Sequence, residues 1–287
     1  KGRHTPLWLK IQKEEIQMRN LKRALSLALA AIMLIGMMVV SASAASYNNL
    51  TDKDEIVNKD AVSMLVSLGI IEGKPDGSYA PTENVDRAQM AKMLSVIMNK
   101  GVDNSALYQS VNSGLVDVNT NWAKGHINYC YTTGIIAGRG NGKFDPSATV
   151  TALEAAKMLL VAVGYDPKIE GFEGADWAIN VSVRADEQGI FEGFTKDLSA
   201  PLNRDDAALL IYNALDVEMI QSYTTNNYPI VYSDHRTILS DKYGVIKVEG
   251  VVTANEWAIL DDDTDTALQE GKTRIYNPDG ILSTTGN

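Results

Sequence analysis

Apolar residues recur at helical spacing in two separate stretches of the chain, and this pattern predicts short amphipathic helices. Between residues 122 and 133, Ile127, Cys130 and Tyr131 stand at positions i, i+3 and i+4 and therefore share one helical face. A second stripe of the same kind consists of Met90, Met93, Leu94, Ile97 and Met98. We expect both faces to pack into a hydrophobic core, in preference to lining a cofactor site or a peptide groove.

Residues at the ends of these stretches give start and stop signals. Gly134 follows the first stripe, and a glycine in this place ends a helix by adopting the left-handed conformation. Asp86 and Thr151 are expected N-caps, and Glu154 stands three residues after Thr151, which is the spacing of a capping box. Asp-Gly and Asn-Gly pairs between the helices mark tight turns. Each unit is therefore predicted to be helix, loop, helix.

This helix–loop–helix pattern occurs three times. The related segments begin at Gly69, Gly134 and Gly189, so the spacing is 65 and then 55 residues. The units, with a linker before the second, are expected at 45–99, 100–164 and 165–217. One helix pair is too small to bury its own apolar face, so the three must pack on one another. We predict a mainly α fold with pseudo-threefold symmetry and similar grooves between neighbouring units.

The start of the chain has the pattern of an export signal. Residues 18–44 combine a basic start, an apolar run from Ala24 to Val40 and a Ser-Ala-Ser-Ala end, which predicts a secretory signal peptide cleaved near Ala44. A membrane anchor is the alternative, but the run of 17 residues is at the lower limit for spanning a bilayer. Residues 1–17 are then interpreted as an over-extended leader.

The end of the chain, residues 218–287, differs from the repeats. It begins with a polar connector over 217–240. Segments rich in β-branched residues follow, and we expect strands within Tyr243–Ala254, Trp257–Leu260 and Thr273–Tyr276. This region is interpreted as the start of a β-rich domain.

Composition narrows the function classes. The chain of 287 residues has 26 Lys and Arg against 36 Asp and Glu. Residues 1–44 hold 7 of the basic and 2 of the acidic residues, so residues 45–287 carry a formal net charge of −15. An acidic balance of this size argues against nucleic-acid binding. The lone Cys130 excludes an intramolecular disulfide, and three scattered histidines offer little for a metal site.

A family resemblance rests on the repeated pattern as a whole. Residues 50–216 read, with departures, as Asp, Trp-Ala, Gly-Ile-Ile-x-Gly, Asp/Asn-Gly-x-Phe/Tyr-x-Pro and Thr-Arg-Ala-Glu. This pattern resembles the S-layer homology module. The resemblance implies three tandem modules forming a three-pronged helical spindle. It also implies non-covalent attachment of an exported protein to the secondary polysaccharide of the bacterial cell wall, a polymer that commonly ends in a pyruvylated amino sugar.

The resemblance implies arginines as the main binding residues. Arg87 and Arg204 match the arginine of the family's Thr-Arg-Ala-Glu motif, and arginine captures a carboxylate in planar, bidentate geometry. Ala152 stands at the matching place in the second unit. We therefore expect the groove that depends on Ala152 to be impaired, or to recruit Arg139 or Lys143.

Each arginine also has a plain structural interpretation. Arg87 is alternatively a solvated arginine at the start of a helix. Arg204 is alternatively paired with the adjoining Asp205 and Asp206.

The remaining binding candidates are less specific. Trp122 and Trp177 match the family's tryptophan and are expected either to contact a sugar ring or to pack in the core, whereas Val57 replaces it in the first unit. The other candidates are Gly73, Gly77, Gly138, Gly142, Asp52 and Asp117. Glycine permits close backbone approach, but turn geometry alone also explains it. For the two acids, which match the leading Asp of the family, a structural role is favoured, and Asp176 fits that register poorly.

Other chemistries find little support in the sequence. The turn around Asp76 lacks the ladder of oxygen ligands of an EF-hand, and the acidic run Asp261–Asp263 with Asp265 is by default a solvated turn. Carboxylates are numerous, but no motif places two of them across a cleft as a glycosidase requires. Cys130 is expected in the core. We predict no catalytic residues, metal or cofactor.

These observations favour one function and keep others open. The leading interpretation is a non-enzymatic module that anchors an exported surface protein, of S-layer type, to secondary cell-wall polysaccharide. The alternative is the wall-targeting part of an exported enzyme whose catalytic domain is C-terminal or missing. Self-association in a surface lattice is a further possibility. Nucleic acid, and a membrane after signal cleavage, are not expected as partners.

Overall fold

The computed structural model describes residues 46–247, 250–254, 268, 273–276 and 282–285. The expected leader 1–17, the expected signal peptide 18–44, the strand expected within 257–260 and the acidic run 261–265 lie outside the described residues. Among the described residues, no helix is long and apolar enough to cross a membrane.

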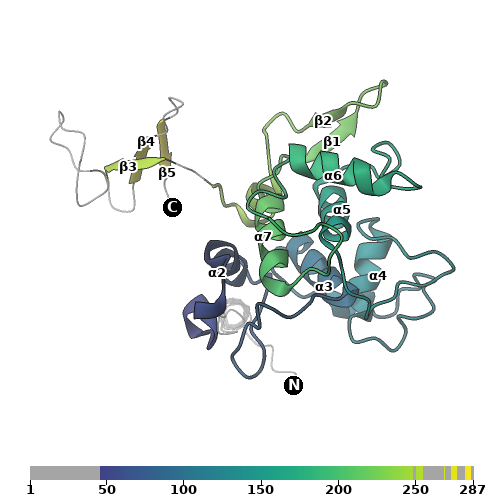
Figure 1. The fold of residues 1–287 in the computed structure, drawn as a ribbon. Helices are drawn as coiled ribbons and strands as arrows, with labels where there is room; N and C mark the ends of the chain where they lie inside the picture. Colours follow the sequence, from purple (N-terminus) through teal and green to yellow (C-terminus); the bar gives the residue numbers. More distant parts are fainter. Residues whose placement is uncertain (1–45, 248–249, 255–267, 269–272, 277–281, 286–287) are drawn as a thin grey trace, which may run out of the picture. The chain divides into compact units, whose positions relative to one another are not determined.

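Six helices between residues 59 and 215 build the core of the part that the structure describes (Figure 1). They are α2 (Lys59–Ser67), α3 (Arg87–Met98), α4 (Lys124–Thr132), α5 (Ala152–Val163), α6 (Trp177–Glu187) and α7 (Arg204–Leu215). Short 3₁₀ helices, η1 (Tyr47–Asn49), η2 (Lys53–Glu55) and η3 (Ser105–Tyr108), precede α2 and α4. The predicted mainly α fold is thus confirmed.

The helices pair between units rather than within them. α4 packs on α3, α6 packs on α5, and α2 packs on α7. Each prong therefore combines the second helix of one unit with the first helix of the next unit, and the last unit closes on the first. By pairing across units, the helices bury the apolar faces that a single unit cannot bury alone, as the sequence predicts.

A closed ring of backbone hydrogen bonds joins the three units. The N–H of Val85 donates to the carbonyl of Leu202 (2.8 Å), that of Leu202 donates to the carbonyl of Val150 (2.8 Å), and that of Val150 donates to the carbonyl of Val85 (2.9 Å). These three residues are equivalent in the repeat, and all three are buried. The ring confirms the predicted pseudo-threefold arrangement.

The expected helix signals are used as predicted. The Asp86 side chain accepts a hydrogen bond from the N–H of Gln89, and Thr151 accepts one from Glu154, so α3 and α5 both begin with capping boxes. Gly134 has a φ of +79°, as expected of the glycine that ends α4. On the α4 stripe, Ile127 and Cys130 are fully buried, but Tyr131 is exposed at the edge of the predicted apolar face.

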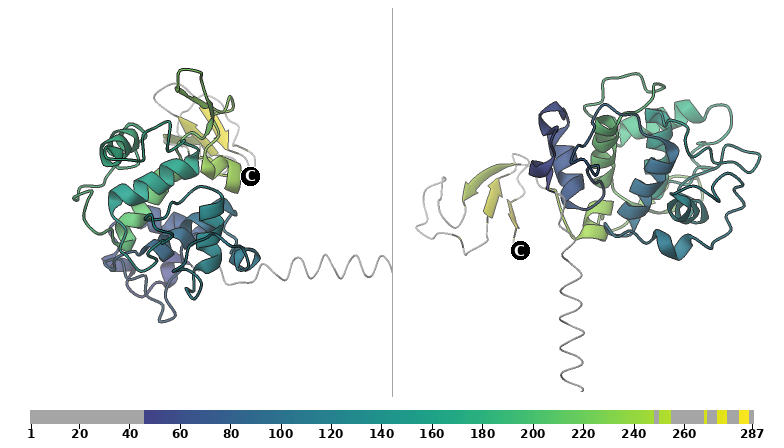
Figure 2. Two further views of the ribbon diagram at one scale, coloured as in Figure 1. Left: turned by 90° about the vertical axis from the view of Figure 1, so that its right-hand side faces the viewer. Right: turned by 90° about the horizontal axis from the view of Figure 1, so that it is seen from below.

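The polar segment after α7, interpreted from the sequence as a connector over 217–240, is folded. It contains a hairpin of β1 (Ile220–Tyr223) and β2 (Pro229–Val231), followed by α8 (Ile238–Tyr243), which packs on α3 and α7 (Figure 2). The Tyr243 hydroxyl donates to the carbonyl of Ile97 (3.2 Å). A few buried side chains, Ile238 and Leu239 among them, fasten this polar stretch to the core.

Further along the chain, three strands form a small antiparallel sheet of their own. β4 (Thr273–Tyr276) lies between β3 (Val251–Ala254) and β5 (Leu282–Thr285). This sheet confirms the predicted β-rich region and two of the expected strands.

Candidate functional site

Two loops that follow the first helices of units one and two are held in place by aspartates. The Asp52 carboxylate accepts hydrogen bonds from the N–H groups of Tyr79 and Ala80, both at 2.7 Å. The Asp117 carboxylate accepts equivalent bonds from Phe144 (2.9 Å) and Asp145 (2.8 Å). Two backbone donors per carboxylate fix each loop close to its own unit.

In each loop the second residue that donates to the aspartate, Ala80 or Asp145, needs this support. Their φ values are +55° and +56°, which are unfavourable for residues other than glycine. Partial burial raises the pKa of Asp117, but the N–H groups of Phe144 and Asp145 outweigh it and hold that pKa below its usual range. Asp52 and Asp117 line neither pocket described below, in keeping with the structural role favoured for them.

Arg87 crosses from the start of α3 to the loop of the second unit. Its Nε donates to the carbonyl of Phe144 (2.7 Å), its Nη2 donates to the carbonyl of Ala137 (2.9 Å), and the guanidinium lies 4.3 Å from the centre of the Phe144 ring. The residue is only 4% exposed, so it is not a solvated arginine. Burial, helped by nearby Arg139, lowers the pKa of Arg87 to about 10, which still leaves it charged at neutral pH.

Arg204 holds the loop of the first unit in the same way. Its Nε donates to the carbonyl of Tyr79 (2.7 Å), and the guanidinium lies 4.8 Å from the Tyr79 ring centre. Neither neighbouring acid is its partner, because Asp205 accepts hydrogen bonds from Asn58 and Asp206 pairs with Lys196. The alternative of a local arginine–aspartate pair was therefore wrong.

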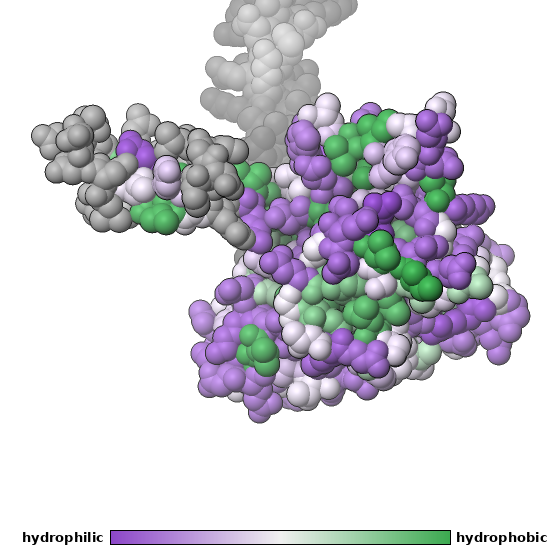
Figure 3. All heavy atoms as spheres, turned by 45° about the horizontal axis from the view of Figure 1, so that its top comes forward, coloured by the Kyte–Doolittle hydropathy of each residue, from purple (hydrophilic) through white to green (hydrophobic). Residues whose placement is uncertain are grey.

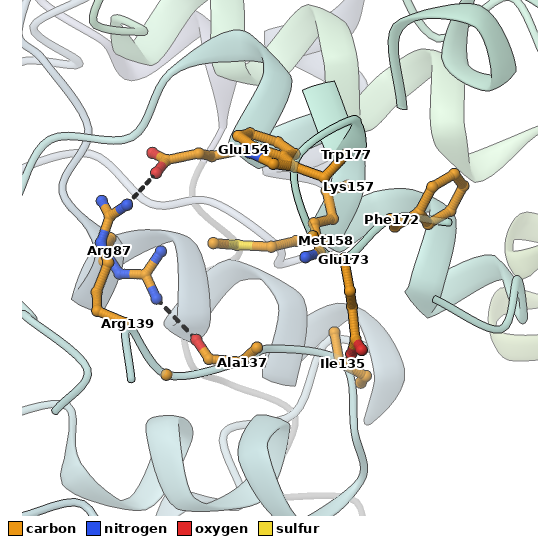
Figure 4. A pocket seen from close by; sticks show the side chains of 12 residues that line it. Arg87, Ile135, Ala137, Arg139, Glu154, Lys157, Met158, Phe172, Glu173 and Trp177 are labelled. Atoms are coloured by element: carbon orange, nitrogen blue, oxygen red, sulfur yellow. Dashed lines mark hydrogen bonds and ion pairs between the residues drawn. The ribbon is translucent and has the colours of Figure 1, made fainter. Parts of the chain in front are cut away.

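The first pocket, which we call the Trp177 pocket, has a volume of about 490 Å³ (Figure 4). Its walls are the second-unit loop, one side of α5, the start of α6 and the Arg87 side chain. Arg139 lies across from α5 and forms an ion pair with Glu154 (2.5 Å), and the Lys157 ammonium is 5.6 Å from the Trp177 ring centre. The polar lining is completed by Glu173.

The second pocket, the Trp122 pocket, has a volume of about 270 Å³. Its walls are the first-unit loop, one side of α3, Trp122 just before α4, and Arg204. Trp122 is 59% exposed, so its ring is accessible to a ligand. Lys92 of α3 forms an ion pair with Glu72 of the loop (3.3 Å). Lys74, which pairs with Glu83, supplies a third cation.

The two pockets match position by position. The equivalent pairs are Arg87 with Arg204, Ala137 with Glu72, Gly138 with Gly73, Arg139 with Lys74, Glu154 with Gln89, Lys157 with Lys92, Met158 with Met93, and Trp177 with Trp122. Each pocket takes its loop and helix from one unit, its tryptophan from the next unit and its arginine from the preceding one. The pockets are therefore complete only when all three units are folded together.

The third equivalent position has different chemistry. Ala152, Leu209 and Val57 replace the arginine, the lysine and the tryptophan, and none of them lines either pocket. Ala152 is fully buried, whereas Val57 is 82% exposed. Arg139 does not compensate for Ala152, since it lies in the Trp177 pocket beside Arg87, and Lys143 lies in neither pocket. The expected recruitment of Arg139 to the groove at Ala152 was therefore wrong, whereas the recruitment of Lys143 stays a prediction.

The four candidate glycines divide into two kinds. Gly73 and Gly138 line the pockets, and a Cβ on Gly138 would come within 2.8 Å of the carbonyl of Lys143. Gly77 and Gly142 lie outside both pockets, and their φ values of +83° and +72° give them the turn role.

Sequence reasoning missed several residues that line the pockets. The residues missed were Lys74, Lys92, Lys157, Met93 and Met158; Met93 had been assigned to the core, and Gln89 and Glu154 were noted only at the helix start. A signal was present, because Lys92 and Lys157, like Met93 and Met158, are separated by the repeat spacing of 65 residues. Figure 3 shows apolar patches set within a mostly polar surface on the face that it presents. Among the described residues, no group of three or more His, Cys, Asp or Glu side chains is arranged to hold a metal ion.

Comparison with known proteins agrees with this geometry. The family model of the S-layer homology domain matches residues 49–91 and 116–156. The chain is 28% identical over 270 residues to a cell surface protein of Thermoanaerobacter kivui, covering 93% of this chain and 32% of that protein. It is 33% identical over 113 residues to an S-layer protein of Bacillus licheniformis, covering 39% of this chain and 12% of that protein.

An enzyme is also among the similar proteins. An amylopullulanase of Thermoanaerobacterium thermosulfurigenes is 30% identical over 172 residues, covering 55% of this chain and 9% of the enzyme. The chain spans about a third or less of the length of these three relatives. With two segments that match the S-layer homology domain and relatives among cell-surface proteins, this chain is a secreted protein of the bacterial cell wall or S-layer.

Proposed function

We propose that this chain anchors an exported protein non-covalently to the bacterial cell wall by binding secondary cell-wall polysaccharide in the Trp177 and Trp122 pockets. The observation that carries the proposal is the duplication of one set of side chains. Each pocket presents an arginine, two further cations, a methionine and a tryptophan at equivalent places.

These side chains suit an acidic sugar. A guanidinium has five N–H donors, and the two hydrogen bonds to loop carbonyls use two of those of Arg87, so donors remain for a carboxylate. The half-buried site strengthens such a charge-assisted bond relative to bulk water. The indole supplies an apolar face on which a sugar ring can lie. A pyruvylated amino sugar, which the family resemblance implied, combines the anionic group and the ring.

The overall acidity of the chain is compatible with an anionic ligand. Residues 45–287 carry a net charge of −15, but charges more than about 8 Å away are screened at physiological salt. Three cations line each pocket, against two carboxylates in the Trp177 pocket and one in the Trp122 pocket. The local field at each pocket therefore favours an anion.

The proposal includes a third module. The family model does not match 165–217, but this segment supplies Arg204 to one pocket and Trp177 to the other, and its Leu202 closes the backbone ring. We propose that 45–99, 100–164 and 165–217 are the three modules, preceded by the signal peptide at 18–44. Only two of the three inter-module positions then bind the polymer.

The rest of the protein decides what is anchored. We favour an S-layer-type protein, since similar proteins include a cell surface protein and an S-layer protein. In that case the protein would also associate with further copies of itself in a surface lattice. The alternative is an exported enzyme with this chain as its wall-targeting part, a reading favoured by the similarity to an amylopullulanase.

A pull-down on purified cell walls tests the proposal. Residues 45–287 should bind walls that retain their polysaccharide and should lose binding after acid extraction of that polymer. Lys92→Ala with Lys157→Ala should weaken binding, whereas Lys143→Ala, outside both pockets, should not. Equal binding to extracted walls would point to peptidoglycan and contradict the proposal.

A further inference from the structure

The two pockets differ in one charge at a corresponding position. Glu154 lines the Trp177 pocket, and its counterpart in the Trp122 pocket is the neutral Gln89. Each pocket has one other carboxylate, Glu173 in the first and Glu72 in the second. The lining charge is therefore +1 in the Trp177 pocket and +2 in the Trp122 pocket.

Glu154 forms an ion pair with Arg139, a cation that an anionic ligand would need. Its Oε1 lies 2.5 Å from the Nη1 of Arg139, and Figure 4 shows this ion pair beside Arg87 in the wall of the pocket. An incoming anion must share Arg139 with a fixed carboxylate, and it meets that negative charge at short range. In the Trp122 pocket the counterpart of Arg139 is Lys74, which is also paired, but with Glu83 outside the lining, and Lys92 pairs with Glu72 at 3.3 Å. The difference is that Gln89, at the place of Glu154, adds no further carboxylate to the lining.

The exchange of Glu for Gln has no consequence for the helix start. Glu154 accepts a hydrogen bond from the N–H of Thr151 (3.2 Å), and Gln89 accepts one from the N–H of Asp86 (3.1 Å). Both side chains complete a capping box. The charge at this position is therefore free to vary without loss of the fold.

We propose that this position sets the charge preference of each pocket: Gln89 lets the Trp122 pocket take a doubly charged sugar substituent such as a phosphate, and Glu154 restricts the Trp177 pocket to singly charged or neutral sugars. This inference rests on the proposed function, because it takes both pockets as sugar sites. A polymer with mixed substituents would then occupy the two pockets with different residues.

Each pocket contains its own reporter for a test. The indole N–H signals of Trp122 and Trp177 in an NMR titration of residues 45–287 report the two pockets separately, and each is assigned by a Trp→Phe variant. The probes are glucose 1-phosphate, which is doubly charged at pH 7.5, glucuronic acid, which is singly charged, and the acid-extracted wall polysaccharide.

We expect glucose 1-phosphate to bind at Trp122 about tenfold more tightly than at Trp177, because one unit charge a few ångströms away acts at intermediate dielectric. Glu154→Gln should raise the affinity at Trp177 about tenfold and leave Trp122 unchanged. Gln89→Glu is the matched reciprocal variant and should lower the affinity at Trp122 only. Glucuronic acid should show smaller differences, and about 1 M salt should shrink them all.

The outcomes separate the inference from the proposed function. If both indoles respond to the probes but Glu154→Gln and Gln89→Glu leave the affinities unchanged, the charge preference is refuted and the sugar sites stand. If neither indole responds to the sugars or to the polysaccharide, the proposed function fails and the inference fails with it. If only the polysaccharide binds, the same reciprocal variants decide the inference with that probe.

Discussion

The two pockets and the third equivalent position share one scaffold but differ in side chains. Val85, Val150 and Leu202 make the same backbone ring at all three places. Around that ring, two positions have arginine, lysine and tryptophan, whereas the third has Ala152, Leu209 and Val57. The ring needs only backbone groups and a buried apolar side chain. The side chains around the ring can therefore differ at one position without loss of the fold.

The largest effect on polysaccharide affinity should come from removing the side chains that distinguish the two pockets from the third position. We expect the fourfold variant Lys92→Ala, Trp122→Ala, Lys157→Ala, Trp177→Ala to lose about a hundredfold or more in affinity for extracted wall polysaccharide, since each charged hydrogen bond is worth about 1.5–3 kcal/mol. Isothermal titration calorimetry measures this change. Val57→Ala at the third position is the control and should bind like the unchanged chain. Equal loss in the control would mean that the third position is also a binding site.

The scaffold should respond in the opposite way, with a change in stability. Asp117→Ala removes the acceptor for two backbone N–H groups, one of them in a residue with positive φ, so we expect a loss of about 3 kcal/mol in the free energy of unfolding. Urea denaturation measures it. Asp176, whose side chain makes no capping hydrogen bond, is the matched control. Asp176→Ala should change stability by less than about 0.5 kcal/mol.

The segment after the third unit should contribute a smaller amount to stability. Tyr243→Phe removes the hydrogen bond to the carbonyl of Ile97, and we expect a loss of about 1 kcal/mol with unchanged polysaccharide binding. Tyr228, which is exposed, is the control: Tyr228→Phe should leave the midpoint of urea denaturation in place. A loss of binding in Tyr243→Phe would show that α8 also shapes a pocket.

The smallest expected effect is a pH dependence of stability, and it comes from a histidine in only one of the three helix pairs, α3 with α4, which borders the Trp122 pocket. His126 of α4 is buried; its Nδ1 lies 2.6 Å from the Ser95 hydroxyl, and its Nε2 lies 3.6 Å from the Asp103 carboxylate. Burial lowers the pKa of His126 from 6.5, assisted by Lys92, although Asp103 opposes this. The equivalent residues in the other units, Ala61 and Val181, do not titrate.

The sign of the pH effect follows from this shift. Below about pH 6.5 the unfolded chain binds a proton that the folded chain resists, so stability should fall as the pH drops through 6.5 toward the folded pKa. His126→Gln should remove this part of the pH dependence between pH 7 and 5 in thermal unfolding. The same slope in both proteins would assign the effect to other groups.

The sequence predicted the fold well because the repeat is a long-range signal. The capping residues and the glycine at 134 are local patterns, and they have the expected roles. The pairing of helices across units could not be predicted from local patterns. The second helix of a unit could pack on the first helix of any unit, because their apolar faces are similar. The fold of 217–240 was not predicted because the segment is mostly polar. Only a few buried side chains, such as Ile238 and Leu239, pack it against the core.

The site was predicted in part for a related reason. Arg87, Arg204 and the two tryptophans were found through their motif, but Lys92 and Lys157 resemble any exposed lysine on a helix until the pocket is seen. Arg139 was placed at the wrong groove, because sequence spacing does not reveal that each pocket takes its arginine from the preceding unit. The task of Asp52 and Asp117 became clear only from their hydrogen bonds to the loops.

The number of polymer chains bound per protein chain tests the central claim most directly. Isothermal titration calorimetry of residues 45–287 with short, acid-extracted fragments of the wall polysaccharide should give two sites. It should give one site for Lys92→Ala with Trp122→Ala and one site for Lys157→Ala with Trp177→Ala. Three sites in the unchanged chain, or an undiminished number in either double variant, would contradict the assignment of binding to these two pockets.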